Sequence, residues 1–407
     1  MDYLELLQSK YQNKAALITD EKTYTYGQLV AASKARREQI DYTENIHFIY
    51  ADKIAEQLLQ FVAYSGTKVV PVIATEASKG QCFDLSDIPQ TACMGVMTSG
   101  STGKSKLLWR SYHSWADFFP EQNRVFAIDE ATIMFCQGSL AFTGNLNMYM
   151  GALAAGATLV VTEKFRPKHW LKLIEEHNVN AIYLIPSKLL LLHKCMEQAN
   201  MKIKTIVSGS QSMGREEADK LKKSFPNGEL TLYYGASELN YITYIKGQDM
   251  TDDKTDIGLP FKNVGVSIKN EEIFIDTPYH VENIEIPFSL KDRGMLDKNG
   301  HLHFLGRTDD IVSVNGIKVA TTKVEAALMA LQEIMEVKCL VFHKDDADIL
   351  TAFIGGAEKI SRQLLVEKLR AAELTDYEIP KQYVFMPSLP KNESGKIDKK
   401  ALQNYTF

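Results

Sequence analysis

The segment Thr98–Lys106 carries the clearest chemical signature in the chain. It reads Thr-Ser-Gly-Ser-Thr-Gly-Lys-Ser-Lys and combines two glycines with hydroxyl residues and two lysines. Glycines let the backbone approach a ligand closely, so that amide N–H groups, hydroxyls and a lysine ammonium can surround phosphate oxygens. The apolar stretch Met94–Met97 before it is typical of a strand that enters a loop. We therefore predict a phosphate site that consists of Thr98, Ser99, Gly100, Ser101, Thr102, Gly103 and Lys104.

This loop has two other interpretations, and the spacing of its glycines tests the first of them. A nucleotide-binding P-loop needs a glycine five residues before the glycine of Gly-Lys-Ser. That position is occupied by Thr98, so the spacing excludes a P-loop NTPase. An ordinary surface loop rich in glycine and serine remains the alternative for this segment taken alone.

The elements that must position this loop follow an alternating order as far as Ser224. Apolar runs typical of buried strands alternate with amphipathic segments typical of helices, which indicates a mostly parallel sheet covered by helices. The strand runs are Ile46–Tyr50, Val69–Ile73, Ala131–Cys136, Ala157–Val161, Ala181–Ile185 and Thr205–Val207. The helical segments include Lys53–Tyr64, Lys168–His177 and Gly214–Ser224.

From about Asn263 the pattern changes to short alternating strands joined by turns. The expected strands are Glu272–Ile275, Glu285–Leu290 and His301–Leu305, the last entered through a hairpin-type turn at Asp297–Gly300. A compact α+β pattern follows, with helix Thr322–Gln332, strands Glu336–His343 and Leu350–Ile354, and helix Ser361–Ala372. We place the boundary at Arg307–Asp310, which predicts one domain over residues 1–306 and a second over 307–407.

Composition and charge narrow the class of protein. The net charge of −5 shows no basic excess, so nucleic acid is not expected as a partner. Five scattered cysteines fit thiols in a reducing cytoplasm better than a disulfide framework. The N-terminus lacks the pattern of a signal peptide, and the longest apolar stretch, Met148–Val161, is too short to span a bilayer. We expect a cytoplasmic protein without a transmembrane segment.

The loop resembles the signature loop of the adenylate-forming superfamily, which includes acyl-CoA synthetases, peptide-synthetase adenylation domains and beetle luciferases. In the family this loop usually ends in Gly-Lys-Pro-Lys, whereas this chain has Ser105 in place of the proline. A second motif, Tyr234-Gly-Ala-Ser-Glu238, resembles the family's Tyr-Gly-x-Thr-Glu. The resemblance implies that Tyr234 stacks on adenine, that Ser237 contacts the α-phosphate and that Glu238 helps to hold Mg²⁺. Tyr233 and Gly235 are implied as further nucleotide contacts.

Two more segments match the family in the expected order. Ser208-Gly-Ser-Gln211 resembles the turn beside the adenine and acyl sites, which implies roles for Ser208, Gly209 and Ser210 in binding the nucleotide. Asp292 lies where the family has the aspartate that binds the ribose hydroxyls, although Lys291 replaces the usual glycine before it. The residues that follow, up to Arg307, resemble the family's next stretch nearly position for position.

The segment Gly306–Gly316 resembles the family's hinge between domains. The resemblance implies that Arg307 contacts the ribose or phosphate, that Asp309 is the pivot and that Gly316 lies beside the path of the incoming thiol. Lys318 takes the place of a common arginine, which keeps the charge but loses the two-pronged hydrogen bonding of a guanidinium. We expect Lys318 to contact phosphate on the coenzyme A side.

The stretch Leu389–Asp398 resembles the C-terminal signature of the family. Lys396 would then be the catalytic lysine, which bridges the incoming carboxylate and the α-phosphate and stabilises the charge that grows there. With Glu238 and Thr98 it completes the expected catalytic set.

The acid-binding pocket is expected around Phe142, Thr143 and Tyr241. Relatives that activate amino acids usually have Phe-Asp at the start of the helix before the Gly-Ala turn, and this chain has Phe142-Thr143 there. A hydroxyl cannot pair with an ammonium group as a carboxylate does. This departure favours a carboxylic acid that is not an amino acid.

Taken together, the resemblance implies an α/β fold with a large N-terminal domain of mostly parallel sheets covered by helices, a small β-barrel-like part, and a small mobile α+β C-terminal domain. The expected activity is ATP- and Mg²⁺-dependent formation of an acyl-AMP with release of pyrophosphate, followed by transfer to the thiol of coenzyme A. Transfer to the phosphopantetheine of an acyl carrier protein and a non-catalytic adenylate-binding role are the alternatives. A homodimer is left open.

Overall fold

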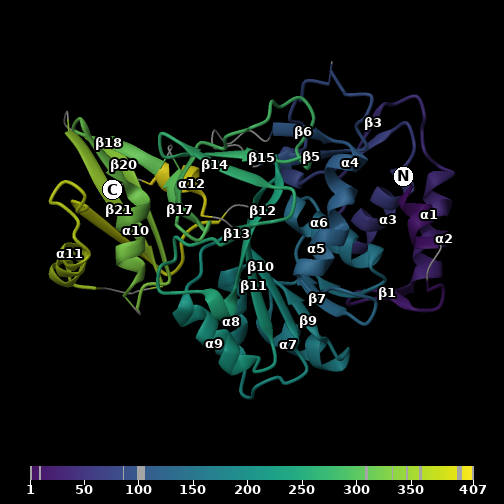
Figure 1. The fold of residues 1–407 in the computed structure, drawn as a ribbon, viewed down its shortest axis with the longest axis horizontal. Helices are drawn as coiled ribbons and strands as arrows, with labels where there is room; N and C mark the ends of the chain where they lie inside the picture. Colours follow the sequence, from purple (N-terminus) through teal and green to yellow (C-terminus); the bar gives the residue numbers. More distant parts are fainter. Residues whose placement is uncertain are drawn as a thin grey trace. The chain divides into compact units, whose positions relative to one another are not determined.

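The computed structural model describes residues 2–8, 11–85, 87–98, 106–307, 310–331, 333–344, 347–356, 360–391 and 397–405. The chain divides into two compact units. The first unit comprises residues 1–269, 274–289 and 295–304, and the second comprises residues 270–273, 290–294 and 305–407. A large, mostly parallel sheet is accompanied by helices and several small sheets, which confirms the expected α/β class (Figure 1).

The central element of the first unit is a 9-stranded sheet with the order β13-β12-β11-β10-β9-β7-β8-β1-β2. The five pairings from β11 across to β1 are parallel, and the pairings at both ends are antiparallel. In chain order the strands are β1 (Ala15–Ile18), β2 (Thr23–Thr25), β7 (Ile133–Gln137), β8 (Thr158–Thr162), β9 (Ala181–Tyr183), β10 (Thr205–Gly209), β11 (Glu229–Ala236), β12 (Asn240–Lys246) and β13 (Leu259–Pro260).

The side chains of this sheet pack on both of its faces, because successive residues of a strand point to opposite faces. Phe135, Ile182, Ile206 and Leu232 belong to one core cluster together with Trp170, Leu189 and Leu221 of three covering helices. Those helices are α7 (Pro167–Glu176), α8 (Pro186–Cys195) and α9 (Arg215–Ser224), which lie together along the sheet in Figure 1. Tyr183 and Tyr233 alternate with the cluster residues and so point to the opposite face, toward α5 (Phe119–Val125) and α6 (Thr143–Ala154).

A second, 4-stranded sheet carries the predicted phosphate loop. Its order is β3 (Ile46–Ile49), β4 (Val70–Ile73), β5 (Met94–Thr98) and β6 (Lys106–Arg110). The first three strands are parallel, whereas β6 runs back antiparallel to β5. The antiparallel return is a feature that the sequence pattern did not predict, and it makes the two strands a hairpin around the loop.

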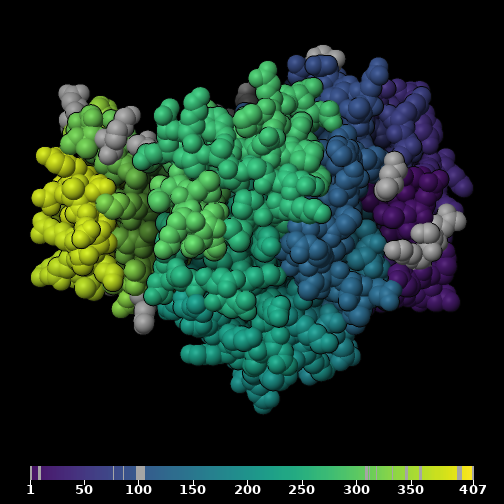
Figure 2. Space-filling model, in the orientation of Figure 1, coloured from purple at the N-terminus to yellow at the C-terminus, as the bar shows by residue number. Residues whose placement is uncertain are grey.

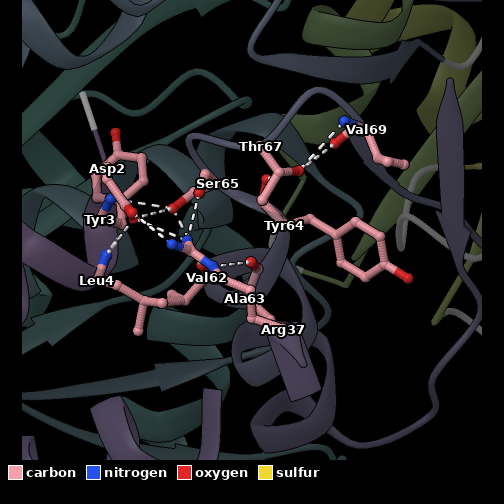
Figure 3. Close-up of polar contacts among 10 residues, drawn as sticks. All are labelled: Asp2, Tyr3, Leu4, Arg37, Val62, Ala63, Tyr64, Ser65, Thr67 and Val69. Carbon is pink, nitrogen blue, oxygen red and sulfur yellow. Dashed lines mark hydrogen bonds and ion pairs between the residues drawn. The ribbon is translucent and has the colours of Figure 1, made fainter. Parts of the chain in front are cut away.

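The N-terminus is anchored by an arginine that joins three helices. These are α1 (Tyr3–Gln8), α2 (Tyr26–Arg37) and α3 (Ile54–Tyr64). Arg37 donates two hydrogen bonds to the Asp2 carboxylate, at 2.5 and 2.9 Å, and others to the carbonyls of Ala63 and Ser65 (Figure 3). The Tyr3 amide donates to the Ser65 hydroxyl. In the space-filling view this purple N-terminal segment forms one continuous surface with the blue segments beside it (Figure 2).

One expected strand is wrong. The segment Glu285–Leu290 contains no strand, and only Phe288 forms an isolated antiparallel bridge, with Ile275. Pro287 has no N–H to donate to a ladder, which explains why pairing does not spread along this segment. The remaining small strands form a 4-stranded sheet of β14 (Gly265–Lys269), β15 (Glu272–Asp276), β16 (Asp292–Leu296) and β17 (Leu302–Arg307).

The second unit has its own apolar core. Val324 and Leu328 of α10 (Thr321–Met329) and Leu365 of α11 (Arg362–Ala371) pack against the sheet residues Cys339 and Ala352. The sheet has the order β20 (Glu336–Lys344), β21 (Ala347–Gly355) and β22 (Gln382–Met386). The second unit also contains the hairpin of β18 (Ile311–Val314) and β19 (Ile317–Ala320) and the helix α12 (Lys399–Gln403). The first unit also contains the short helix α4 (Tyr112–Trp115).

Candidate active site

The predicted phosphate loop is framed by the β5–β6 hairpin. The last backbone pair of this hairpin joins Thr98 to Lys106. The side chain of Thr98 and the predicted contacts Ser99, Gly100, Ser101, Thr102, Gly103 and Lys104 lie outside the described residues. What the described residues establish is the frame: the two ends of the loop are held side by side by antiparallel hydrogen bonding.

The predicted turn Ser208–Ser210 lies at the carboxyl end of β10. The Ser208 hydroxyl is buried and donates to the carbonyl of Leu184 at 2.7 Å, so it joins two neighbouring strands. Gly209 pairs with Tyr233 of β11, and a Cβ at Gly209 would come within 2.5 Å of the Tyr233 ring. Ser210 is exposed and has a φ of 70°, so the chain turns sharply away from the sheet there. This turn offers a ligand the exposed Ser210 and the backbone, because the Ser208 hydroxyl is already used.

The motif Tyr234-Gly-Ala-Ser-Glu238 occupies the end of β11 and the tight turn that leads to β12. Gly235 is required there, because a Cβ would lie 2.5 Å from the carbonyl oxygen of Asn240. The Tyr234 ring is half-buried with its centroid 5.9 Å from that of Phe304, and Glu238 is half-exposed. The carboxyl ends of parallel strands are where open α/β sheets bind ligands. The motif therefore presents an aromatic face, a hydroxyl and a carboxylate at that edge.

Thr143 joins the predicted acid pocket to this motif. Thr143 is the first residue of α6, and its side-chain hydroxyl lies 3.0 Å from the hydroxyl of Ser237. Phe142 precedes the helix in extended conformation and is half-buried. The structure thus brings the predicted acid contact and the predicted α-phosphate contact into direct hydrogen-bonding distance.

Two buried tyrosines stand behind the start of α6. The hydroxyls of Tyr183 and Tyr233 lie 2.8 Å apart, and a Cβ at Gly144 would be 3.0 Å from each of them. Burial raises the pKa of Tyr233 to about 12 and raises that of Tyr183 well above its ordinary value, so both are neutral at physiological pH. Tyr241 is 1% exposed and packs edge-on against Tyr233, with a ring-centroid distance of 4.6 Å. Tyr241 therefore supports the pocket from within the aromatic core.

Sequence reasoning missed Tyr183 and Arg110. Tyr183 ends the strand β9, and only the sheet order brings it to Tyr233. Arg110 ends the apolar strand β6, and its side chain is fully buried. A charged residue at the end of the run Leu107-Leu108-Trp109 was the one signal in the sequence that could have drawn attention to it.

In the second unit the predicted ribose contact Asp292 meets Arg307, the predicted ribose or phosphate contact. The Arg307 guanidinium lies 3.2 Å from the carboxylate of Asp292, which is 1% exposed, whereas the Arg307 side chain is 58% exposed. Gly316 has a φ of 84° in the turn between β18 and β19, and Lys318 pairs with Ser313 along that hairpin. The predicted pivot Asp309 lies outside the described residues.

The predicted catalytic residue Lys396 also lies outside the described residues, but the chain on both sides of it is held in place. Lys391 and Ile397 form an antiparallel bridge, and the Asp398 carboxylate caps α12 by accepting from the amides of Lys400 and Ala401. Lys399 then pairs with Asp310 at 2.8 Å. Burial alone would raise the pKa of Asp310, but Lys399 and Lys338 outweigh it and hold that pKa below its ordinary value. The flanks of the Lys396 segment are thus tied to the residue that follows Asp309.

Comparison with known proteins identifies the family. The sequence profile of the family described as AMP-binding enzyme matches residues 52–278, which is more than half of the chain. The chain belongs to this AMP-binding enzyme family.

Two curated proteins illustrate the range of its relatives. The chain is 28% identical over 331 residues to an uncharacterized acyl–CoA ligase, YhfT, of Bacillus subtilis, a match that covers 76% of this chain and 67% of the relative. It is 24% identical over 436 residues to a component of the mycosubtilin synthase of Bacillus subtilis, covering 95% of this chain and 17% of that much longer protein.

A solved structure shares the fold over nearly the whole chain. The O-succinylbenzoate coenzyme A synthetase MenE of Bacillus subtilis, solved in complex with ATP and magnesium ion, superposes with a TM-score of 0.83. The match covers 99% of both chains at 17% sequence identity. Across the part of the chain described above, no helix has both the length and the apolar character needed to cross a membrane.

Proposed function

We propose that this protein activates a carboxylic acid with ATP, forming an acyl-AMP and pyrophosphate, and then transfers the acyl group to the thiol of coenzyme A. The observation that carries the proposal is the contact between Thr143 and Ser237, whose hydroxyls lie 3.0 Å apart. One belongs to the expected acid pocket and the other to the expected α-phosphate contact. Their adjacency suits a reaction in which the acid's carboxylate attacks the α-phosphorus, because holding the reactants close together supplies much of the acceleration.

The residues at the sheet edge fit a nucleotide and its metal ion. Tyr234 offers a half-buried ring for adenine, and Glu238 offers a half-exposed carboxylate, the donor type that Mg²⁺ prefers. A bound Mg²⁺ would neutralise charge on the phosphates. In the proposed reaction Thr98–Lys104 surrounds phosphate oxygens, Lys396 stabilises charge that builds up at the α-phosphate, and Asp292 and Arg307 contact the ribose. Asp309 is the proposed pivot, with Gly316 and Lys318 on the thiol side.

The acid is proposed to lack an α-amino group. Among the described residues, the start of α6 carries two hydroxyl pairs, Thr143 with Ser237 and Tyr183 with Tyr233. Each of these groups is neutral, and a buried ammonium group without a negative partner would be strongly disfavoured. Gly144 packs against both tyrosine hydroxyls, so a larger residue at this position would clash with them.

Loading of a carrier protein is the second candidate. The match to the mycosubtilin synthase component, which spans 95% of this chain, supports it. The two candidates share the adenylation step and differ only in the molecule that carries the thiol.

The test is ATP–pyrophosphate exchange across a panel of acids, followed by comparison of coenzyme A with a phosphopantetheinylated carrier protein as acceptor. Exchange with a non-amino acid and thioester formation with coenzyme A are the expected results. Glu238→Gln should abolish exchange, and Glu229→Gln, at the exposed start of β11, the strand that leads to the Glu238 turn, is the matched control. Absence of exchange with every acid would instead favour a non-catalytic adenylate-binding protein.

A further inference from the structure

Arg110 is a fully buried arginine at the base of the phosphate-loop hairpin. It is the last residue of β6 and pairs along the backbone with Met94 of β5. Its side chain is 0% exposed. Burial lowers its pKa to about 10, with the charges of Cys93 and Glu238 acting in the opposite direction, so the guanidinium remains a cation at neutral pH. Burying a charge costs free energy, so a structural or functional role must offset the cost of burying Arg110.

The guanidinium donates to three backbone carbonyls from three separate segments. One nitrogen, Nη1, donates to Ser114 at 3.0 Å and to Tyr279 at 3.1 Å. The other, Nη2, donates to the carbonyl of Ser237 at 2.6 Å. The last of these bonds reaches directly into the turn that presents the Ser237 hydroxyl and the Glu238 carboxylate.

The segment 279–282 contacts both the hairpin and this turn. The Val281 amide donates to the carbonyl of Glu238 at 2.8 Å, and the Glu282 amide donates to the carbonyl of Trp109 at 2.8 Å. The Arg110 side chain joins the same segment and the same turn through its bonds to the carbonyls of Tyr279 and Ser237. The hairpin and the Ser237–Glu238 turn are thereby joined by these backbone hydrogen bonds and by those of the Arg110 side chain.

We propose that Arg110 is a positioning residue for the nucleotide site, which holds the Ser237–Glu238 turn in register with the hairpin that carries the phosphate loop. The inference rests on the proposed function, because it assumes that ATP binds between these two parts. A planar guanidinium suits the role, since it donates from two nitrogens in fixed directions, and a lysine ammonium cannot reproduce that fork.

The experiment compares Arg110→Met and Arg110→Lys with Arg37→Met. Arg37 is a matched control, because it also donates to backbone carbonyls, those of Ala63 and Ser65, but it lies in the N-terminal helices (Figure 3). The readouts are the affinity for MgATP by calorimetry, amide hydrogen exchange in residues 237–241 and 281 without ligand, and thermal unfolding.

The Arg110 variants should bind MgATP about tenfold to a hundredfold more weakly, as expected for a misplaced binding group. Their amides at 237–241 and 281 should exchange faster than in the wild type. Arg37→Met should lower the unfolding temperature while leaving MgATP affinity and exchange in this turn unchanged. If Arg110→Met does not fold, Arg110→Lys keeps the positive charge and tests only the loss of hydrogen bonding from the two guanidinium nitrogens.

Two outcomes overturn the proposal: MgATP affinity in the Arg110 variants equal to that of the wild type, or equal losses of affinity in the Arg110 and Arg37 variants. Failure of the proposed function would look different, because the wild-type protein itself would then bind no MgATP and show no pyrophosphate exchange.

Discussion

The hydroxyl of Thr143 lies 3.0 Å from that of Ser237, although 94 residues separate them in the chain. The first begins a helix that follows β7, and the second sits in the turn that follows β11. Their contact links the two halves of the proposed reaction, the acid and the α-phosphate. We expect this contact to make the effects of changing the two residues interdependent.

Thr143→Val and Ser237→Ala should therefore show non-additive effects on kcat/KM in pyrophosphate exchange. Residues in direct contact typically show coupling energies of about 0.5–3 kcal/mol in a double-mutant cycle. Thr158→Val provides the control, because that hydroxyl bonds to the carbonyl of Ala15 far along the chain from the turn. Strict additivity between Thr143→Val and Ser237→Ala would show that the contact does not contribute to the reaction.

Lys396→Ala should abolish adenylation while leaving thioester formation from supplied acyl-AMP nearly intact. A positioned charge at the α-phosphate is worth roughly a hundredfold or more in rate. The measurement is pyrophosphate exchange beside single-turnover transfer from synthetic acyl-AMP. Lys400→Ala, an exposed lysine in α12, is the control. Wild-type exchange in the Lys396→Ala variant would remove this lysine from the proposed catalytic set.

Asp292→Ala should raise KM for ATP by about tenfold with a smaller change in kcat, because a ribose contact is made equally before and during the reaction. The fold should tolerate the change, since the partner Arg307 is 58% exposed and stays hydrated. Steady-state kinetics at varied ATP give the answer, with Asp276→Ala, an exposed residue of β15, as the control. An unchanged KM would leave Asp292 as only the ion-pair partner of Arg307.

Asp2→Asn should lower the free energy of unfolding in a pH-dependent way. Burial alone would raise the pKa of Asp2, but hydrogen bonds from Arg37 and neighbouring groups outweigh it, so the pKa lies below its ordinary value of 3.8. The carboxylate is therefore charged in both the folded and the unfolded state above that pH, where its stabilisation is complete. This stabilisation is lost as the pH falls through the lower pKa that Asp2 has in the folded state.

Urea unfolding checks this expectation. At pH 7 Asp2→Asn should be about 1 kcal/mol less stable than the wild type, because its hydrogen bonds to the Arg37 cation are only partly buried and solvent weakens them. The difference should shrink as the pH falls below 3.8, the ordinary value. The exposed Asp52→Asn serves as the control. A difference independent of pH would mean that Asp2 acts through packing rather than through its charge.

Much of the secondary structure could be predicted from local patterns. The strand expected at Ile46–Tyr50 is found at Ile46–Ile49, and the helix expected at Lys53–Tyr64 is found at Ile54–Tyr64. Runs of buried apolar residues and amphipathic periodicity are local properties of the chain, so they can be read without knowing its partners. Where a local rule was overlooked, as at Pro287 in Glu285–Leu290, the expected strand is wrong.

The residue types likewise led to a prediction of the kind of chemistry. Glycines, hydroxyls and lysines at Thr98–Lys106 predict a phosphate site, and Thr98 itself excludes the P-loop spacing. These conclusions depend only on the order of residues, because backbone freedom, charge and hydrogen-bonding groups belong to each residue by itself.

Only the tertiary structure decided which of these residues meet. The sheet order sets β10 beside β11 and so brings Gly209 to Tyr233, and the antiparallel return of β6 delivers Arg110 to the carbonyl of Ser237, 127 residues away. Such contacts depend on strand order and on the direction of each side chain, which arise from packing over the whole sheet. The sequence thus predicts a phosphate loop, and the packing of two sheets decided which groups stand beside its frame.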